Sequence, residues 1–376
     1  MLGDFCATDD QTPTENSVSK MSTPSQIGYH MPAEWEPHSA IWLSWPHDPL
    51  TFPNVEEAER AYVQIIAAIH TSEMVNLQVL DAEMEERVSA LLATANVDLS
   101  RVRFWKNDYA DVWFRDYGPI FVKNQEGKLA MTHWIFNAWG NKYEELLKDT
   151  NVPMFMNQTL KMERFTPNIV LEGGSIEVNG AGILVTTEQC LLNKNRNPQL
   201  TKTQIEQYLK DYLGVRKILW LKEGIEGDDT DGHIDDIARF VAPNTILCAY
   251  EDNPTDPNHA ILKENYERLQ RMTDQQGKLL KIIKLPMPGY VRDDQGLIDE
   301  AKRRLPASYA NFYVGNTVVL VPVFGHQNDE KALNIIGQCF PGRKVVGINC
   351  RWLVYGLGTL HCISQQQPTS SFKEKQ

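Results

Sequence analysis

The stretch AIWLSWPHDPLTFPNVEEAERAYVQIIAAIHTSEMVNLQVL, residues 40–80, indicates the class of fold. Residues 40–45 and 75–80 are short apolar runs, which are typical of buried strands. Between them, residues 54–71 begin with acidic side chains and then place apolar ones at helical spacing. These apolar residues are Ala58, Tyr62, Ile65, Ile66 and Ile69. A strand, an amphipathic helix and a second strand in succession predict an α/β protein.

The same alternation of strand-like and helix-like segments continues along the chain. We expect helices at residues 84–94, 201–213 and 256–274. We expect strands at residues 102–105, 119–122, 182–187, 218–221, 239–242, 318–323 and 344–348. No low-complexity linker interrupts residues 30–365, which predicts a single domain over residues 27–367. The polar residues 1–26 are expected to be disordered, and residues 368–376 are expected to form a flexible tail.

The charge of the chain limits the partners that it is expected to bind. It has 376 residues, with 37 basic and 49 acidic side chains, and a formal net charge of −12. This balance repels nucleic acids and anionic membranes, so neither is expected as a partner. It favours a small cationic ligand, although surface acids usually serve only solubility.

The cysteines predict a reducing compartment. None of the six forms a C-x-x-C pair, and no His or Cys spacing matches a structural zinc site. Free thiols are therefore expected, and with them a cytoplasmic location. The N-terminal residues 1–10 lack the basic and apolar regions of a secretory signal. No run of about eighteen apolar residues occurs, so no membrane span is predicted.

Four short motifs carry side chains that are suited to chemistry. They are DVWFRDYGP at residues 111–119, LEGGS at 171–175, GDDTDGHIDDIA at 227–238 and GLGTLHC at 356–362. Such motifs recur at intervals of roughly sixty residues, which suggests several similar α/β units around one centre. Each also has a simpler explanation when it is taken alone. The four explanations are a surface ion pair, a glycine turn, a solvated acidic loop and a buried structural cysteine.

Together, the motifs fit the hydrolysis of a guanidinium group. That group is planar, stays protonated and presents donors that match carboxylates. Its carbon needs a strong nucleophile, and a thiolate serves when nearby cations lower the pKa of the thiol. A histidine can protonate the leaving nitrogen and then activate water. The motifs therefore predict a cysteine-dependent hydrolase that acts on guanidines.

Two other enzyme classes use some of the same residue types. A papain-like thiol protease also needs a cysteine and a histidine, but it leaves Asp116 and Glu172 without a role. A zinc hydrolase needs more histidine or cysteine ligands than these motifs contain. The surplus of carboxylates favours the guanidinium substrate over both alternatives.

At this point the motifs resemble those of agmatine deiminases (agmatine iminohydrolases), within the porphyromonas-type peptidylarginine deiminase superfamily. The resemblance extends over most of the chain. The matching segments are MPAEWEPH (31–38), WFRDYGP (113–119), FNAWGNKY (136–143), LEGGS (171–175), LNKNRNP (192–198), GHIDD (232–236) and HCISQQQP (361–368). Several ordered motifs of this length are very unlikely to arise by chance.

The resemblance implies a fold and a set of residue roles. The expected fold is a five-bladed α/β-propeller (pentein) of ββαβ units around a central active site, with no cofactor and no metal. Cys362 matches the nucleophile and His233 the general acid and base. Asp116 and Asp235 match the carboxylates that bind the guanidinium, and Glu172 matches the acid near His233, in the same site.

The resemblance also implies a reaction. It is the hydrolysis of the C–N bond of a linear amidine, in which agmatine gives N-carbamoylputrescine and ammonia through a thiouronium intermediate. This reaction belongs to putrescine and polyamine biosynthesis. A homodimer is a further expectation. Two alternatives stay open, namely deimination of peptidyl-arginine or another guanidino compound, and a weakly active guanidino-binding protein of the same fold.

Some positions near the site differ from the family pattern. Members usually read Gly-Gly-Gly-Asn-Ile-His-Cys up to the nucleophile, whereas Leu357 and Thr359 stand here in place of a glycine and the asparagine. The familiar Asn-Asp-x-Trp begins with Ala110 in this chain. Trp113, which ends that motif, matches the aromatic residue that lines the aliphatic stem of the substrate.

Overall fold

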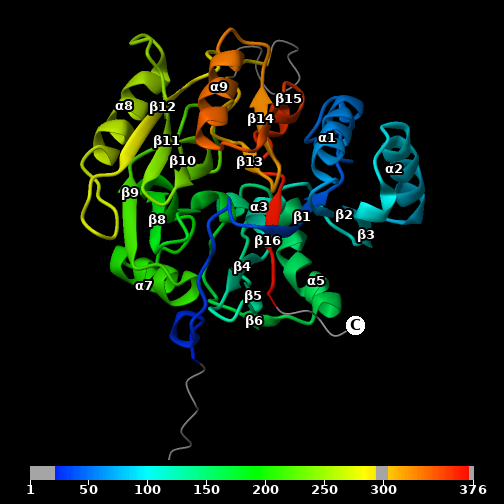
Figure 1. Cartoon of the computed structure of the whole chain (residues 1–376), viewed down its shortest axis with the longest axis horizontal. Coiled ribbons are helices and arrows are strands. Elements are labelled where there is room, and N and C mark those ends of the chain that lie inside the picture. Colours follow the sequence, from blue (N-terminus) through cyan, green and yellow to red (C-terminus); the bar gives the residue numbers. More distant parts are fainter. Residues whose placement is uncertain (1–21, 294–303, 372–376) are drawn as a thin grey trace, which may run out of the picture.

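Five small sheets follow one another in this computed structural model, which describes residues 22–293 and 304–371 (Figure 1). Four of these sheets contain three strands and one contains four. In Figure 1 the strands surround the middle of the molecule, and the longer helices lie toward the outside. The alternating sequence pattern correctly predicts this mixed α/β architecture.

The second sheet along the chain shows the pattern that the others repeat. β4 (Ile120–Lys123) pairs antiparallel with β5 (Leu129–Thr132), and β5 pairs parallel with β6 (Glu163–Phe165). A parallel pair needs a connection that crosses from one end of the sheet to the other. Here that connection contains α5 (Val152–Leu160). The unit is therefore ββαβ.

The three later sheets have the same order. One contains β7 (Glu177–Val178), β8 (Ile183–Thr187), α7 (Lys202–Leu213) and β9 (Lys217–Leu221). The next contains β10 (Ala238–Ala242), β11 (Thr245–Tyr250), α8 (Pro257–Leu269) and β12 (Lys281–Pro286). The last contains β13 (Tyr313–Val314), β14 (Val318–Val323), α9 (Asp329–Cys339) and β15 (Lys344–Asn349). In each unit, the helix lies between the two parallel strands along the sequence.

The first sheet is completed by a strand from the other end of the chain. β1 (His38–Ser44) pairs parallel with β2 (Met74–Val79), and β2 pairs parallel with β3 (Val102–Lys106). The two crossovers contain α1 (Val55–Ile69) and α2 (Ala82–Thr94). The antiparallel partner of β1 is β16 (Gln365–Pro368), which Figure 1 shows beside it. With β16 counted, five ββαβ units are present, which confirms the predicted fold class.

The remaining helices are short. The α-helical ones are α3 (Phe114–Tyr117), α4 (Ala138–Asn141) and α6 (Glu188–Leu191). The 3-10 helices are η1 (Ser25–Ile27), η2 (Leu99–Arg101), η3 (Glu144–Asn151), η4 (Gly173–Ser175), η5 (Ile234–Asp236) and η6 (Leu353–Gly356). η4 packs against both α3 and η5, so three of the chemical motifs meet at these turns.

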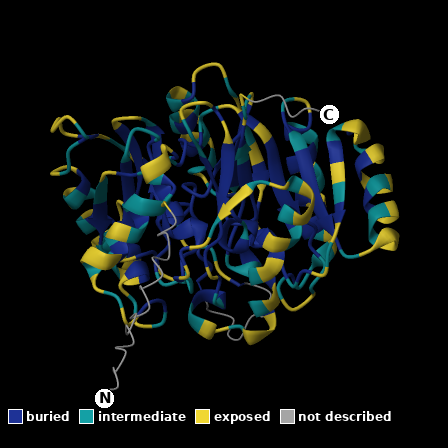
Figure 2. Cartoon of the chain, turned by 90° about the horizontal axis from the view of Figure 1, so that it is seen from below, coloured by how far each residue is buried: buried dark blue, intermediate teal, exposed yellow. Residues whose placement is uncertain are grey.

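Local sequence signals explain where the long helices begin. Asn54 caps α1, because its side chain accepts the Glu57 N–H at 3.2 Å. α7 begins with a capping box, in which Thr201 and Gln204 each bond to the other's backbone. The five apolar residues of the face predicted for α1 are all buried. Figure 2 shows the same division in the fold, with buried strands inside and exposed helix faces outside.

The predicted domain limits can be compared with the structure near the two ends of the described chain. Residues 1–21 and 372–376, which form most of the two predicted terminal segments, lie outside the described residues. Within the described part, η1 begins at Ser25. The Thr369 N–H donates to Pro37 O at 2.8 Å, and the Ser371 N–H donates to Gly127 O at 3.1 Å. The limits 27–367 stay a prediction.

No helix in the described ranges combines the length and the apolar character that crossing a membrane requires.

Candidate active site

The turns that carry the four chemical motifs converge inside the molecule. Asp116 lies on α3, His233 and Asp235 lie at η5, and Cys362 precedes β16. Gly174 of η4 stands between the first three of these. A methyl group on this glycine would lie 2.6 Å from His233 Nδ1, 2.9 Å from Asp116 Oδ1 and 3.1 Å from Asp235 Oδ2. The second glycine of LEGGS is therefore needed for the three side chains to converge.

Cys362 is nearly buried, with 7% of its surface exposed. Its sulfur accepts a hydrogen bond from Asn311 Nδ2 at 3.1 Å and donates to Asp235 Oδ2 at 3.6 Å. Burial and the carboxylates of Asp235, Asp236 and Asp116 raise the pKa of this thiol well above its ordinary value. The resting sulfur is therefore a thiol, and a cation beside it would promote its ionisation.

Asp235 is oriented by a buried histidine. His361 Nδ1 lies 2.8 Å from Asp235 Oδ2, and His361 Nε2 lies 2.8 Å from Glu34 Oε1. His361 thus bridges the two carboxylates, and burial together with the charges of Arg115 and Arg239 lowers the pKa of its imidazole. Burial would raise the pKa of Asp235, but the hydrogen bond and charge of His361 hold it below its ordinary value. Asp235 is therefore an ionised carboxylate beside Cys362.

Asp116 is held by donors on both oxygens. Trp139 Nε1 donates to Oδ2 at 2.9 Å, and the Gly174 N–H donates to Oδ1 at 3.0 Å. Oδ1 also lies 3.8 Å from His233 Nδ1. Burial raises the pKa of Asp116 to about 6, although the charge of His233 opposes the shift. A cation that binds here would stabilise the carboxylate form.

His233 is buried beside Asp116. Neither ring nitrogen hydrogen-bonds to a described residue. Burial alone would lower the pKa of His233, but Asp116, Cys190 and Glu172 raise it well above its ordinary value. The imidazole is therefore protonated and can act as a general acid.

Glu172 lies beside His233 but is bonded to an arginine. Arg196 Nε donates to Glu172 Oε1 at 2.6 Å, and both side chains are fully buried. Glu172 Oε2 bonds to no described residue. Arg196 Nη1 also donates to Asp231 Oδ2 at 2.8 Å. Glu172 is thus a charged neighbour of His233, and its direct contact with a substrate stays a prediction.

A cavity of about 370 Å³ lies against this group of side chains. Trp113, Asp116 and Cys362 form part of its wall, whereas His233, Asp235 and Glu172 do not. Its acidic lining residues are Asp48, Asp111, Asp116, Glu145 and Asp229. No lysine, arginine or histidine of the described chain lines it. The volume suits a small molecule, and the lining suits a cationic one.

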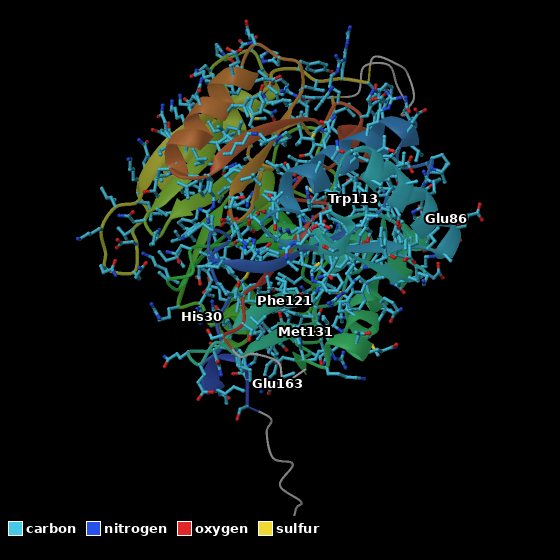
Figure 3. All side chains as sticks on the ribbon, turned by 45° about the vertical axis from the view of Figure 1, so that its right-hand side comes forward. His30, Glu86, Trp113, Phe121, Met131 and Glu163 are labelled. Atoms are coloured by element: carbon cyan, nitrogen blue, oxygen red, sulfur yellow. The ribbon has the colours of Figure 1, made fainter. Side chains whose placement is uncertain are left out.

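Trp113 forms an aromatic part of the cavity wall. Figure 3 shows it in the interior, whereas Glu86 projects from the surface. Trp113 Nε1 donates to Asp111 Oδ2 at 2.9 Å, which fixes the ring. A methyl group on Gly358 would lie 2.4 Å from Trp113 Cζ3, so only glycine lets the turn approach the ring this closely.

The turn before Cys362 contains two of the three departures from the family pattern. Leu357 lines the cavity and has φ of 70°, in the left-handed region. That conformation costs a residue with a Cβ roughly 1 kcal/mol. Thr359 is buried, and its Oγ1 donates to Asn311 Oδ1 at 2.8 Å. Leucine thus keeps the backbone conformation that a glycine would adopt and adds an aliphatic side chain to the wall.

Sequence reasoning missed several residues that hold the site. Glu34, Trp139 and His361 lie inside segments that carry the family resemblance, but nothing in their spacing assigned them a role. Asn311 stands in the run SYANFY, where its amide is a polar group among aromatic residues. A polar residue within an aromatic run is a signal that could have identified Asn311, because a buried amide needs hydrogen-bond partners.

Two buried groups in the described chain have the residue types of metal ligands. They are Glu172 with Cys190 and His233, and Glu34 with Glu177 and His361. In both groups a guanidinium already neutralises a carboxylate, since Arg196 binds the first and Arg239 binds the second. That charge opposes a metal cation. The expectation of no metal and no cofactor stays a prediction.

Comparison with known proteins gives a consistent result. The family model of the Porphyromonas-type peptidyl-arginine deiminases matches residues 30–368. An agmatine deiminase of Medicago truncatula is 39% identical over 374 residues, which cover 92% of this chain and 98% of the relative. An agmatine deiminase of Stutzerimonas stutzeri is 40% identical over 364 residues, which cover 92% of this chain and 97% of the relative.

Solved structures show the same similarity. The agmatine deiminase of Enterococcus faecalis has a TM-score of 0.84 and 35% identity, over 93% of this chain and 98% of that one. A C. jejuni agmatine deiminase with substrate bound has a TM-score of 0.81 and 32% identity, over 91% and 97% of the two chains. The matched region includes all four chemical motifs.

Proposed function

Because the chain belongs to the Porphyromonas-type peptidyl-arginine deiminase family, we propose that it hydrolyses agmatine to N-carbamoylputrescine and ammonia. Relatives of 39% and 40% identity are agmatine deiminases. The observation that carries the proposal is the cavity, whose wall combines the Cys362 thiol with five carboxylates and no basic side chain of the described chain. A small substrate with a cation at each end fits that lining.

Asp116 and Asp235 bind the guanidinium in this proposal. Asp235 Oδ1 is buried and bonds to no described residue, so it can accept a guanidinium N–H. Asp116 is part of the cavity wall. The other Asp235 oxygen, Oδ2, lies 3.6 Å from the sulfur of Cys362. A guanidinium held by both carboxylates therefore has its carbon next to the nucleophile.

Binding of the cation also activates the thiol. Two of the three carboxylates that raise the pKa of Cys362, Asp235 and Asp116, are those that the guanidinium neutralises, so the bound substrate lowers this pKa again. The thiol releases its proton to solvent, and the thiolate adds to the guanidinium carbon. His233 donates a proton to one amino group, which leaves as ammonia. The remaining adduct is a thiouronium on Cys362.

Water completes the reaction. His233, now neutral, removes a proton from a water molecule, and the oxygen attacks the thiouronium carbon. The carbon–sulfur bond then breaks and the hydroxyl of the adduct gives its proton to the departing sulfur, which restores the Cys362 thiol and releases N-carbamoylputrescine. The overall change consumes one water and liberates one ammonia.

The same lining disfavours arginine. Arginine differs from agmatine by an α-carboxylate, which would have to enter a cavity with acidic residues and no cationic partner among the described residues. A buried anion without a partner is strongly destabilised. Agmatine places an ammonium there instead, beside acids such as Asp48, Glu145 and Asp229.

We expect purified protein to release ammonia from agmatine at least roughly a hundredfold more efficiently than from free arginine or a blocked arginyl peptide, because an uncompensated carboxylate costs about 3 kcal/mol or more. The measurement is kcat/KM from ammonia release, with the three substrates in parallel. Preference for the peptide would keep the cysteine chemistry and refute the substrate. Silence on all three would contradict the enzymatic function.

Leu357 is expected to limit the length of the substrate. Leu357→Gly removes an aliphatic side chain from the cavity wall and suits the left-handed backbone at this position. We expect the preference for agmatine over its homologue with one more methylene to fall about tenfold, the usual size of discrimination by one methylene. Parallel kcat/KM values for both amines test this. An unchanged ratio would show that Leu357 does not contact the chain of the substrate.

Two further expectations remain proposals. The five described cysteines are free, which supports a reducing compartment such as the cytoplasm. The homodimer stays a prediction from the family resemblance.

A further inference from the structure

The side chain of Asn311 connects the nucleophile to the turn that carries it, and no step above uses it. Asn311 is 1% exposed. Its Nδ2 donates to Cys362 Sγ at 3.1 Å and to Asp236 Oδ1 at 3.1 Å. Its Oδ1 accepts from Thr359 Oγ1 at 2.8 Å, from the His361 N–H at 2.9 Å and from the Cys362 N–H at 3.4 Å. One carboxamide thus bonds both the reacting sulfur and the backbone beneath it.

The hydrogen bonds fix which way this amide faces. Backbone N–H groups only donate, so the atom that faces the N–H groups of His361 and Cys362 must be the oxygen. The NH₂ group therefore has to face the sulfur and Asp236. The pKa of Asp236 is raised well above its ordinary value by burial and by the charges of Asp235 and Asp228. Asn311 is thus held as a hydrogen-bond donor to the nucleophile.

We propose that Asn311 is a further catalytic residue, whose Nδ2–H stabilises the thiolate form of Cys362. A hydrogen bond donated to an anion favours the ionised form over the neutral one. This proposal shares one premise with the function proposed above, namely that Cys362 is the nucleophile.

The charged surroundings of the sulfur explain why such a donor matters. Asp235 and Asp236 face it from η5, and Asp116 faces it from α3. The imidazole of His361, the preceding residue, is turned toward carboxylates. All three aspartates oppose ionisation of the thiol, whereas hydrogen bonds from the Asn311 amide and the Thr359 backbone favour it. These donors therefore favour ionisation of the Cys362 thiol, as the substrate cation does, and they are present before the substrate binds.

Two substitutions remove the donor, and only the first keeps the oxygen of the amide. Asn311→Asp keeps the shape and the oxygen that faces the turn, but it replaces the N–H donor with an oxygen. Asn311→Ala removes the donor without adding charge near Asp236. Thr359→Val is the matched control, because it removes one hydrogen bond to the same amide oxygen and leaves the N–H beside the sulfur.

The measurement is the rate of alkylation of Cys362 by iodoacetamide against pH, read by mass spectrometry of its peptide. Cys362→Ser identifies alkylation at other cysteines. In both Asn311 variants we expect the midpoint to rise by about one pH unit or more, and kcat for agmatine to fall roughly tenfold to a hundredfold with KM changed less than about threefold. In Thr359→Val we expect a midpoint shift below about 0.3 units and a smaller loss of kcat.

An unchanged midpoint in the Asn311 variants would overturn the proposal, and so would an equal shift in Thr359→Val. If the Asn311 variants do not fold, the wild-type protein labelled with ¹⁵N-asparagine carries the test. The Asn311 amide resonance, assigned by its change in Cys362→Ser, should titrate with the midpoint of alkylation. An amide that does not follow the thiol would refute the proposal. Alkylation needs no agmatine, so an error in the proposed substrate would leave this result unaffected.

Discussion

Cys362→Ala is expected to abolish ammonia release from agmatine while agmatine still binds. The variant lacks the sulfur that forms the covalent bond, so neither the attack nor the later hydrolysis can occur. Asp116 and Asp235 remain to bind the guanidinium, and the cavity keeps its acidic lining. Ammonia release measures turnover, and isothermal titration with agmatine measures binding.

Cys350→Ala is the matched control for this experiment. Cys350 is also a free and fully buried cysteine, but it does not line the cavity. Its substitution is expected to lower thermal stability and to leave turnover close to the wild-type value, because a buried sulfur is lost from the core. Ammonia release that persisted in Cys362→Ala would rule out the covalent mechanism.

Asp116→Ala is expected to cost at least ~3 kcal/mol of transition-state stabilisation, because a buried cation loses its carboxylate partner. This corresponds to a fall in kcat/KM of roughly a hundredfold or more. His233 lies 3.8 Å from the same carboxylate, so its imidazolium also loses support. Steady-state kinetics with agmatine measure the effect.

Asp149→Asn controls for the loss of any buried carboxylate. Asp149 is 1% exposed and accepts the N–H groups of Ala110 and Asp111, but it does not line the cavity. We expect it to lower the melting temperature with less than a tenfold change in kcat/KM, since its bonds are structural. A change below tenfold in Asp116→Ala would assign Asp116 the same structural role.

The long elements of the fold could be predicted from sequence because burial imposes a period on them. Residues 54–71 and 201–213 were expected to be helical, and they contain α1 and α7. β16 could not be predicted, because Gln365–Pro368 has no apolar alternation. Its strand conformation follows from pairing with β1, and tertiary pairing overrides local preference in such short polar segments.

The site could be predicted in part for a chemical reason. A guanidinium substrate requires carboxylates, a nucleophile and an acid, and these residue types stand out in short motifs. The contacts that orient them could not be predicted, since they join distant positions. Glu34 and His361 are 327 residues apart and Asn311 and Cys362 are 51 apart, so no local spacing rule relates them.

The placement of β16 has a consequence for the timing of activity during synthesis. On the ribosome, Cys362 and this strand emerge after all the other strands described here, and domains fold as their chain becomes complete. Until then the first sheet lacks its partner on one side, and the thiol is absent. A nascent or prematurely terminated chain that ends before Cys362 therefore lacks both the thiol and the strand that pairs with β1.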